Sequence, residues 1–451
     1  MSKAADDIAT GPLVEFALAL NSSSLPAPVQ HECRRALLDA IGCIIGGARH
    51  EIVERAHHAL HEFTGPATTS LLGRSERTDA LHAALLNGLA GAAYSFFDSY
   101  SDALLHPGGP VTAALLAVAE RRPVTGAQFL AALAAGVETA CRLTKLAVLP
   151  PAEGNMSWSQ SGVAGGVGAA LAAGRLLDLP APQLRWAIGI AASEASGTRV
   201  EHGTMAASLI FGRAAQSGLR AALLAKHGFT SSARPIEGPH GFASVFSARP
   251  NFTALVNGLG SEFELLGNTY KPFPTGVVVH PAIDAMLQLK RRHSFEAKDI
   301  SRIGLNVTPS AVTFGSRAQP ADDLEAKFSI QHWVAAAALR GKAGIQEGTL
   351  ANVKDPEIIR LRSITVVDAD PLLPPYGARL ALELSGGRRL ESSVEHCVGS
   401  PQAPMSDEAL EAKFLDQCEP LIGGLRAKSL AAMCWRILDL EDATELARSA
   451  C

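Results

Sequence analysis

The sequence lacks the features that mark several common classes of protein. Its 451 residues carry 40 Lys and Arg against 44 Asp and Glu, a net charge of −4, which leaves no basic surface for nucleic acid. The first eleven residues lack a positive region followed by an apolar run, and the longest uncharged stretch, at 157–174, is rich in Gly and Ser. We therefore expect no secretory signal, no membrane-spanning helix and a cytoplasmic location.

Cysteines at metal-ligand or redox spacing are also missing. No CxxC and no Cys/His cluster is present, and an odd, dispersed set of cysteines is typical of a reduced compartment. No P-loop, GxSxG or HExxH sequence occurs, so we expect neither a metal nor another cofactor. The seven cysteines are Cys33, Cys43, Cys141, Cys397, Cys418, Cys434 and Cys451.

Small and aliphatic residues are abundant instead. Hydrophobic residues make up 47% of the chain and charged residues 19%, which suits a well-packed protein of two or three domains. Up to about residue 267, one helical pattern follows another, and many of these segments are apolar nearly all round and rich in Ala and Gly. Since small side chains let helices approach closely, we predict an all-helical domain over residues 1–267.

The pattern changes near residue 268. Four segments alternate polar and apolar residues and predict strands, the last two joined as a hairpin across Gly386-Gly387. Helical patterns occur at 281–292 and 326–341. We predict a smaller α+β domain with an antiparallel sheet over residues 268–400, followed by helices at 401–451 that return to the first domain. The four strand segments are 300–310, 361–368, 377–385 and 388–399.

Three segments concentrate side chains suited to chemistry. The first, FFDSYSDALLHPGGP at 96–110, places acids, a tyrosine and an imidazole ahead of a turn, although such residues are also common at the polar end of a helix. The second, at 268–287, holds Lys271 between rigid prolines and has His280 before a proline that begins a helix. The third, GTRVEHG at 197–203, offers a guanidinium for carboxylates, or is a solvated loop.

Several longer segments fall in the order and spacing of a known family. The match covers roughly residues 10–440 and resembles the MmgE/PrpD family, which includes 2-methylcitrate dehydratase, cis-aconitate decarboxylase and an iminodisuccinate epimerase. The resemblance implies a mainly α protein with a large, discontinuous helical domain and a smaller α+β lid, usually a homodimer, with the site between the two domains. The matching segments are LLHPGGPVTAALLAVAE, GVAGGVGAALAAGRLLDL, GRAAQSGLRAALLAKHGF, YKPFP…HPAIDA and EAKFSIQH.

The sequence departs from the pattern of the dehydratase and decarboxylase members. Their Asp-Phe-Asp-Asp-Thr run, aligned on the His-Pro pair, is Phe-Phe-Asp-Ser-Tyr here, at 96–100. Their lysine ahead of the GRAA segment is Ala207, and the segment at 157–161 lacks the histidine of their Gly-Trp/Phe-His-x-Thr. The residues that do match are His106, Lys271 and His280.

These losses favour one reaction of the family. A dehydratase must also protonate a departing hydroxide, and a decarboxylase must hold one carboxylate in an apolar site and reprotonate a carbanion. An epimerase only removes a proton α to a carboxylate and returns one on the other face, while donors stabilise the enolate. We therefore predict an isomerase, a cofactor-independent epimerase of a small polycarboxylate resembling iminodisuccinate. The alternatives are a lyase in which Asp102 replaces the lost acid, and a non-catalytic polycarboxylate-binding protein.

The resemblance and the residue types together give an expected site. Proton transfer and enolate stabilisation are assigned to Lys271, His280, Tyr100 and His106, with Asp98 orienting one of them. Residues expected to bind the substrate carboxylates or to wall the pocket are Arg199, His202, Trp158, Gln160 and, from the lid, Arg317. The expected partners are the small-molecule substrate and a second copy of the chain.

Overall fold

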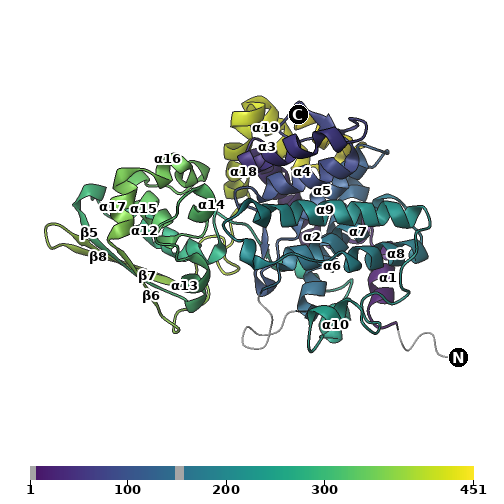
Figure 1. The fold of residues 1–451 in the computed structure, drawn as a ribbon, viewed down its shortest axis with the longest axis horizontal. Coiled ribbons are helices and arrows are strands. Elements are labelled where there is room, and N and C mark those ends of the chain that lie inside the picture. Colours follow the sequence, from purple (N-terminus) through teal and green to yellow (C-terminus); the bar gives the residue numbers. More distant parts are fainter. Residues whose placement is uncertain (1–6, 148–156) are drawn as a thin grey trace.

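The structure is a computed structural model that describes residues 7–147 and 157–451. The expectation of no secretory signal concerns the N-terminal segment, of which residues 1–6 lie outside the described residues. A helical body and a smaller part with a sheet lie side by side (Figure 1). Within the described ranges, no helix is long and apolar enough to cross a membrane. The helices of the body before residue 268 are α1 (Thr10–Ala19), α2 (Ala27–Gly47), α3 (Glu51–Leu60), α4 (Ala80–Ala92), α5 (Gly108–Ala119), α6 (Gly126–Ala147), α7 (Gln160–Leu176), α8 (Ala181–Ser193), α9 (Met205–Lys226), α10 (Phe242–Phe246) and α11 (Phe252–Val256).

The helices of the body approach one another at glycines. A Cβ atom on Gly212 of α9 would lie 2.3 Å from the carbonyl oxygen of Leu85 in α4. A Cβ atom on Gly218 would lie 2.6 Å from the carbonyl oxygen of Gly166 in α7. The helix backbones are therefore in direct contact, and the close packing predicted from the Ala and Gly content is confirmed.

The smaller part contains a four-stranded sheet in the order β6-β5-β7-β8. The predicted hairpin is confirmed, because β7 and β8 pair antiparallel. The expectation of a wholly antiparallel sheet is wrong, since β5 and β6 pair in parallel. A parallel pair needs a long crossover, and here helices cross between the two strands. The strands are β5 (Ile300–Val307), β6 (Thr365–Ala369), β7 (Ala378–Leu384) and β8 (Arg389–Val394).

Two helical patterns predicted for this part correspond to α12 and α15. The second begins at Ile330 rather than at 326, because the Ser329 side chain accepts a hydrogen bond from the His332 amide and starts a new helix there. Lys327 and Phe328 therefore lie in a connection between two helices. The helices of the smaller part are α12 (His280–Arg292), α13 (Pro309–Gly315), α14 (Asp323–Ala326), α15 (Ile330–Arg340), α16 (Leu350–Val353) and α17 (Pro356–Ser363).

The C-terminal helices pack against the helical body, in part against helix α2. These are α18 (Asp407–Ile422), α19 (Gly424–Trp435) and α20 (Thr444–Ser449). Phe414 of α18 packs where Gly42 of α2 leaves room for its ring. One hydrophobic core combines residues before 271 with residues after 404, and a second core lies between Phe273 and Cys397. We propose domain boundaries near 267 and 400, where the chain passes from one core to the other.

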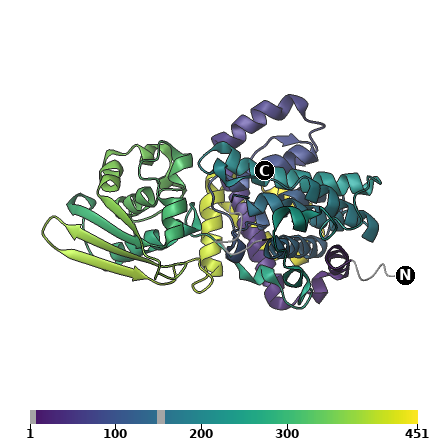
Figure 2. The same cartoon turned by 60° about the horizontal axis from the view of Figure 1, so that its bottom comes forward.

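A short two-stranded ladder joins two of the three segments in which the sequence concentrates side chains suited to chemistry, 96–110 and 268–287. Strand β3 (Ser99–Tyr100) pairs antiparallel with β4 (Asn268–Thr269), so that Ser99 lies opposite Thr269. The ladder brings the chain before His106 against the chain before Lys271. Turning the molecule shows the C-terminal helix α18, in yellow, between the sheet-containing part and the rest of the body (Figure 2).

The close contact of α4 with α9 gives a first prediction. Gly212→Ala forces a methyl group against the α4 backbone and should lower the free energy of unfolding by about 1–3 kcal/mol, measured by urea denaturation. Gly109→Ala is the matched control, because no heavy atom lies within 4 Å of its added methyl. It should cause no loss of stability. Equal effects of the two substitutions would contradict the backbone contact.

Candidate active site

A cavity lies where the helical body meets the smaller part. Its volume of about 140 Å³ suits a small metabolite, since pockets for drug-sized molecules are typically about 300–1,000 Å³. Apolar side chains form much of its wall: Phe97, Ile210, Phe211, Val277, Val278, Phe314, Leu324 and Phe328. The polar side chains with a basic group that line it are His106, Arg199, His202, Lys271 and Lys327.

His106 presents one ring nitrogen to the cavity. Its Nδ1 lies 2.6 Å from the carbonyl oxygen of Asp98, which can only accept, so Nδ1 carries the proton and Nε2 is a free base. The backbone amide of His106 donates to Ser161 Oγ at 3.0 Å. Burial and the nearby Lys271 charge hold the pKa of His106 well below its usual range. At neutral pH the imidazole is therefore uncharged and fixed in one tautomer.

Asp98 is buried behind the cavity and ties its parts together. Its Oδ2 accepts hydrogen bonds from the Gly108 amide at 2.9 Å and from Asn268 Nδ2 at 2.8 Å. These contacts fix the first residue of α5 and the first residue of β4. Burial raises the pKa of Asp98 to about 7. Its side chain does not line the cavity, and its contact with His106 is made by the backbone carbonyl oxygen; the orienting role stays a prediction.

Lys271 enters the cavity beside His106. Its Nζ donates to the carbonyl oxygen of Ser95 at 2.9 Å and lies 4.7 Å from the centre of the Phe97 ring. The His106 ring packs on the same phenylalanine, with ring centres 4.5 Å apart. Burial, with repulsion from Lys413, lowers the pKa of Lys271 to about 7. Near neutral pH, Lys271 is therefore present in both protonation states.

Arg199 and His202 come from the connection before α9, as the sequence suggested. Arg199 Nε donates to the carbonyl oxygen of Trp158 at 3.0 Å, which leaves its terminal nitrogens available. His202 stacks on Phe328, with ring centres 4.9 Å apart and an interplanar angle of 9°. Burial and the Arg199 charge lower the pKa of His202 to about 4, so this imidazole is neutral.

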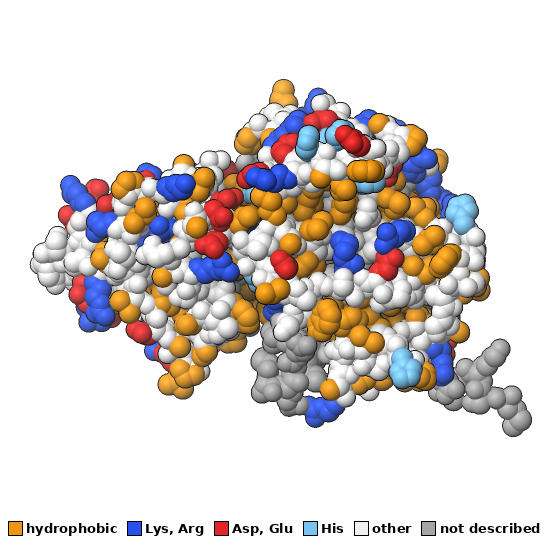
Figure 3. Space-filling model, viewed as in Figure 1, with side chains coloured by type: hydrophobic (Ala, Val, Ile, Leu, Met, Phe, Trp, Pro, Cys, Tyr) orange, Lys and Arg blue, Asp and Glu red, His pale blue; other side chains and the backbone are white. Residues whose placement is uncertain are grey.

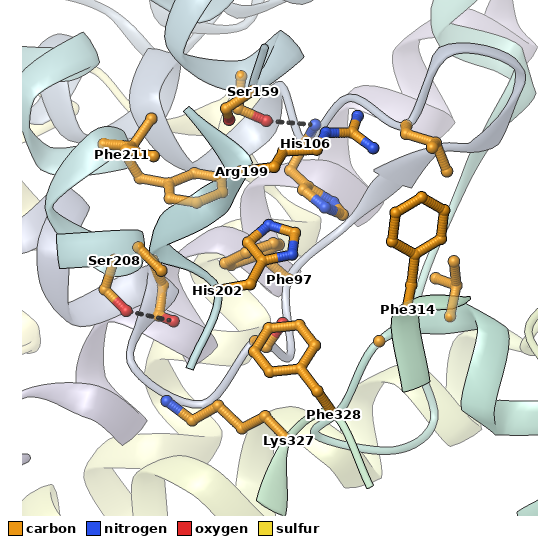
Figure 4. Close-up of a pocket in the computed structure, with 18 of the residues that line it drawn as sticks. Phe97, His106, Ser159, Arg199, His202, Ser208, Phe211, Phe314, Lys327 and Phe328 are labelled. Carbon is orange, nitrogen blue, oxygen red and sulfur yellow. Dashed lines mark hydrogen bonds between the residues drawn. The ribbon is translucent and has the colours of Figure 1, made fainter. Parts of the chain in front are cut away.

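Lys327 is a cavity residue that the sequence analysis did not select. It lies in the connection between α14 and α15, its side chain runs along one edge of the cavity (Figure 4), and its Nζ donates to the carbonyl oxygen of Ala93. The segment EAKFSIQH, which contains Lys327, contributed to the family resemblance. That resemblance was the feature of the sequence that could have identified Lys327 as a site residue. Lysine next to three acids in a helix-forming run is otherwise typical of a solvated surface.

Two predicted proton-transfer residues do not line the cavity. The Tyr100 hydroxyl donates to Glu264 Oε2 at 2.5 Å, and this contact together with burial raises its pKa above the usual range. His280 is buried against Phe273, with ring centres 5.5 Å apart, and burial lowers its pKa to about 3. The expected direct roles for these two side chains do not fit the structure, because neighbouring groups hold them elsewhere.

Three predicted substrate-binding residues also lie outside the lining. The Trp158 ring packs edge-on against Phe246. Its backbone carbonyl oxygen accepts a hydrogen bond from Arg199, a residue that lines the cavity. Gln160 is buried in the first turn of α7. Arg317 is engaged by Glu325 at 3.1 Å and by the carbonyl oxygen of His202 at 3.0 Å, so it braces the cavity rather than lining it.

The positions that differ from the lyase pattern are structurally informative. Ala207 and Ser159 line the cavity, so the absence of a lysine and a histidine there is an absence from the site itself. Phe96 lies outside the lining and packs under the Lys413 ammonium, 4.1 Å from its ring centre. Asp102 is exposed and does not line the cavity either. Among the described residues, no Asp or Glu belongs to the lining.

The fold and this site define a mainly helical protein with a cavity, lined by basic and apolar side chains, where its two parts meet. The model described as the MmgE/PrpD N-terminal domain matches residues 11–255, and that of the MmgE/PrpD C-terminal domain matches residues 273–437. The chain therefore belongs to the MmgE/PrpD family, as its sequence motifs suggested.

Curated relatives at moderate identity are enzymes. Cis-aconitate decarboxylase from Mus musculus is 26% identical over 436 residues, which cover 92% of this chain and 88% of the relative. The Homo sapiens protein of the same name is 26% identical over 434 residues, with the same coverage. The protein of that name from Aspergillus terreus (strain NIH 2624 / FGSC A1156) is 26% identical over 297 residues, 63% of this chain and 60% of the relative.

The anchoring role of Asp98 gives a second prediction. Asp98→Ala leaves the Gly108 amide and the Asn268 amide without a buried acceptor and should lower the free energy of unfolding by about 2–3 kcal/mol. Asp102→Ala, four residues on at the surface, should change it by less than about 0.5 kcal/mol. Urea denaturation measures both. Loss of activity in a stable Asp102→Ala protein would show that Asp102 does replace the acid missing from the lyase pattern.

Proposed function

We propose that this chain is a cofactor-independent enzyme that transfers protons at a carbon α to a carboxylate of a small polycarboxylate, with epimerisation of an iminodisuccinate-like molecule as the net reaction. The observation that carries the proposal is the lining of the cavity. Five side chains there have a basic group, and no described lining residue is an acid. Such a cavity favours a ligand of several negative charges, because buried cations need counter-ions.

The two proton-transfer roles suit the protonation states found at neutral pH. His106 Nε2 is a free base, held in its tautomer by the Asp98 carbonyl, and removes the α-proton. The electron pair of the broken C–H bond passes into the adjacent carboxylate, and the resulting enolate is stabilised by Arg199. Lys271, as an ammonium, donates a proton to the other face of the carbon. Phe97 lies against both His106 and Lys271 and excludes water between them.

Dehydration fits this site less well than epimerisation. A departing hydroxide must take up a proton from an acid placed near it, in addition to the proton transfer at carbon. Ala207 and Ser159 supply no such group from their positions in the wall. The described lining therefore supports one exchange of protons at carbon better than an elimination.

Decarboxylation is the second candidate, because the relatives are named cis-aconitate decarboxylases and because the cavity has an apolar wall. A carboxylate placed against Phe314 and Val278 is poorly solvated, which favours its loss as carbon dioxide. The electron pair of the broken C–C bond stays on the carbon, and Lys271 protonates it. Both reactions use the same cations and differ in which bond breaks.

The apolar surface supports the homodimer, which stays a prediction. In Figure 3, hydrophobic side chains gather on the helical body, over the region that α9 crosses in Figure 1. Leu209 of α9 is 43% exposed and Val200, just before that helix, is 81% exposed. Exposed apolar surface of this kind is often covered by a partner.

Proton NMR in deuterium oxide tests the reaction directly. Incubation with iminodisuccinate isomers, 2-methylcitrate, citrate and cis-aconitate should place deuterium at one α position, with a change of configuration and no new alkene signal. Release of carbon dioxide would instead establish a decarboxylase. A new alkene signal without release of carbon dioxide would establish a hydro-lyase. His106→Asn should slow the exchange by about 10²–10⁴-fold. His396→Asn, at an exposed histidine of the smaller part, is the control and should exchange at the wild-type rate.

The pH dependence of kcat/KM is a further prediction. His106 stays neutral down to low pH because its pKa is well below the usual range, whereas Lys271, with a pKa of about 7, loses its proton as the pH rises. Between pH 6 and 7 the rate should therefore change little, and above about pH 7 it should fall about tenfold per pH unit. A profile that instead rises through pH 7 would make Lys271 the base.

A further inference from the structure

Lys327 is a buried lysine in the wall of the cavity. Its side chain is buried, and the hydrogen bond from Nζ to the Ala93 carbonyl uses one of three N–H groups. Within residues 7–147 and 157–451, Lys327 forms no ion pair. Lys271, by contrast, has both Ser95 oxygens and the face of Phe97 around its ammonium.

The acids nearest to Lys327 do not serve as its partners. The negative charge of Asp323 raises the pKa of Lys327 without forming an ion pair with it. The Asp323 carboxylate is paired with His50, with Nε2 and Oδ2 3.3 Å apart. Burial lowers the pKa of Lys327 to about 8, so at neutral pH most molecules carry the ammonium. A buried ammonium without a counter-ion is costly, and an anion in the cavity removes that cost.

The backbone of Lys327 is held firmly in place. Its carbonyl oxygen accepts hydrogen bonds from Thr275 Oγ1 at 2.5 Å and from the Gly276 amide at 3.3 Å. The next residue, Phe328, is stacked on His202 across the cavity. A lysine fixed in this way presents its charge at one place and loses little conformational entropy when it binds a ligand.

Arg199 provides a second free cation away from Lys327. The two side chains lie at opposite ends of the cavity, with His202 and Phe328 between them (Figure 4). The terminal nitrogens of Arg199 have no ion pair among the described residues, and burial lowers its pKa through loss of hydration. A molecule with a carboxylate at each end would place one negative charge near each of these cations.

We propose that Lys327 binds a second carboxylate of the substrate, opposite the one bound by Arg199, and so makes the cavity select for molecules with at least two carboxylates. The inference rests on the proposed function, because it takes polycarboxylates as the ligands. It assigns Lys327 to recognition and leaves proton transfer to His106 and Lys271.

Isothermal titration calorimetry on the full chain tests this role with two matched, unreactive probes. Succinate and butyrate both have four carbons, and butyrate lacks the second carboxylate. Lys327→Met should weaken succinate binding by about 10- to 100-fold, since a hydrogen bond to a charged group contributes about 1.5–3 kcal/mol. Butyrate binding should change less than twofold. Lys342→Met, at an exposed lysine of the smaller part paired with Glu347, should bind both probes as the wild type does.

Several results would overturn the inference. To separate loss of folding from loss of recognition, Lys327→Arg, which keeps the charge, is measured in parallel and should retain the preference for succinate. An equal loss for both probes, or no loss for succinate, would remove Lys327 from recognition. A fall in kcat with unchanged KM would make it a proton-transfer residue instead. If the wild type binds neither succinate nor tricarballylate nor iminodisuccinate, the proposed function itself fails.

Discussion

The site depends on one buried carboxylate and the chain around it. Asp98 Oδ2 accepts from the first amide of α5 and from Asn268 at the start of β4, while the Asp98 carbonyl accepts from His106 Nδ1. Asp98 thus holds the start of α5, eight to ten residues further along the chain, and the start of β4, which is 170 residues away. Its burial is costly, as the raised pKa of about 7 indicates, and the two N–H donors offset part of that cost. A water molecule in place of Asp98 would satisfy the donors but would not fix their relative positions.

The cavity takes its electrostatic character from the end of a helix. Lys327, Lys271 and Lys413 donate to the carbonyl oxygens of Ala93, Ser95 and Phe96, immediately after α4 ends. A helix C-terminus carries only about half a negative charge, so it stabilises three ammonium groups incompletely. Lys413 has Asp39 as a full counter-ion, with Nζ and Oδ1 2.6 Å apart. Among the described residues, the two lysines that face the cavity form no ion pair, and this supports the polyanionic ligand proposed for the cavity.

Periodicity predicted the elements of the fold, but it did not predict which group engages each polar side chain. The helices and the β7–β8 hairpin followed from hydrophobic patterns, whereas the parallel β5–β6 pair depends on a crossover that no local pattern encodes. In the site, His106, Lys271, Arg199 and His202 do converge. Tyr100 does not join them, because Glu264, 164 residues away, accepts its hydrogen bond. Lys327 was not predicted as a site residue because its local sequence is typical of a surface helix.

The choice between the proposed reactions depends on what surrounds a single carbon atom. The cations at the two ends of the cavity serve epimerisation and decarboxylation alike, since both pass through a carbanion next to a carboxylate. Epimerisation additionally needs a base and an acid on opposite faces of that carbon, and the proposal gives these roles to His106 and Lys271, which both contact Phe97. Decarboxylation needs only the acid. A neutral, tautomer-fixed imidazole has a function in the first reaction and none in the second, and this difference favours the epimerase.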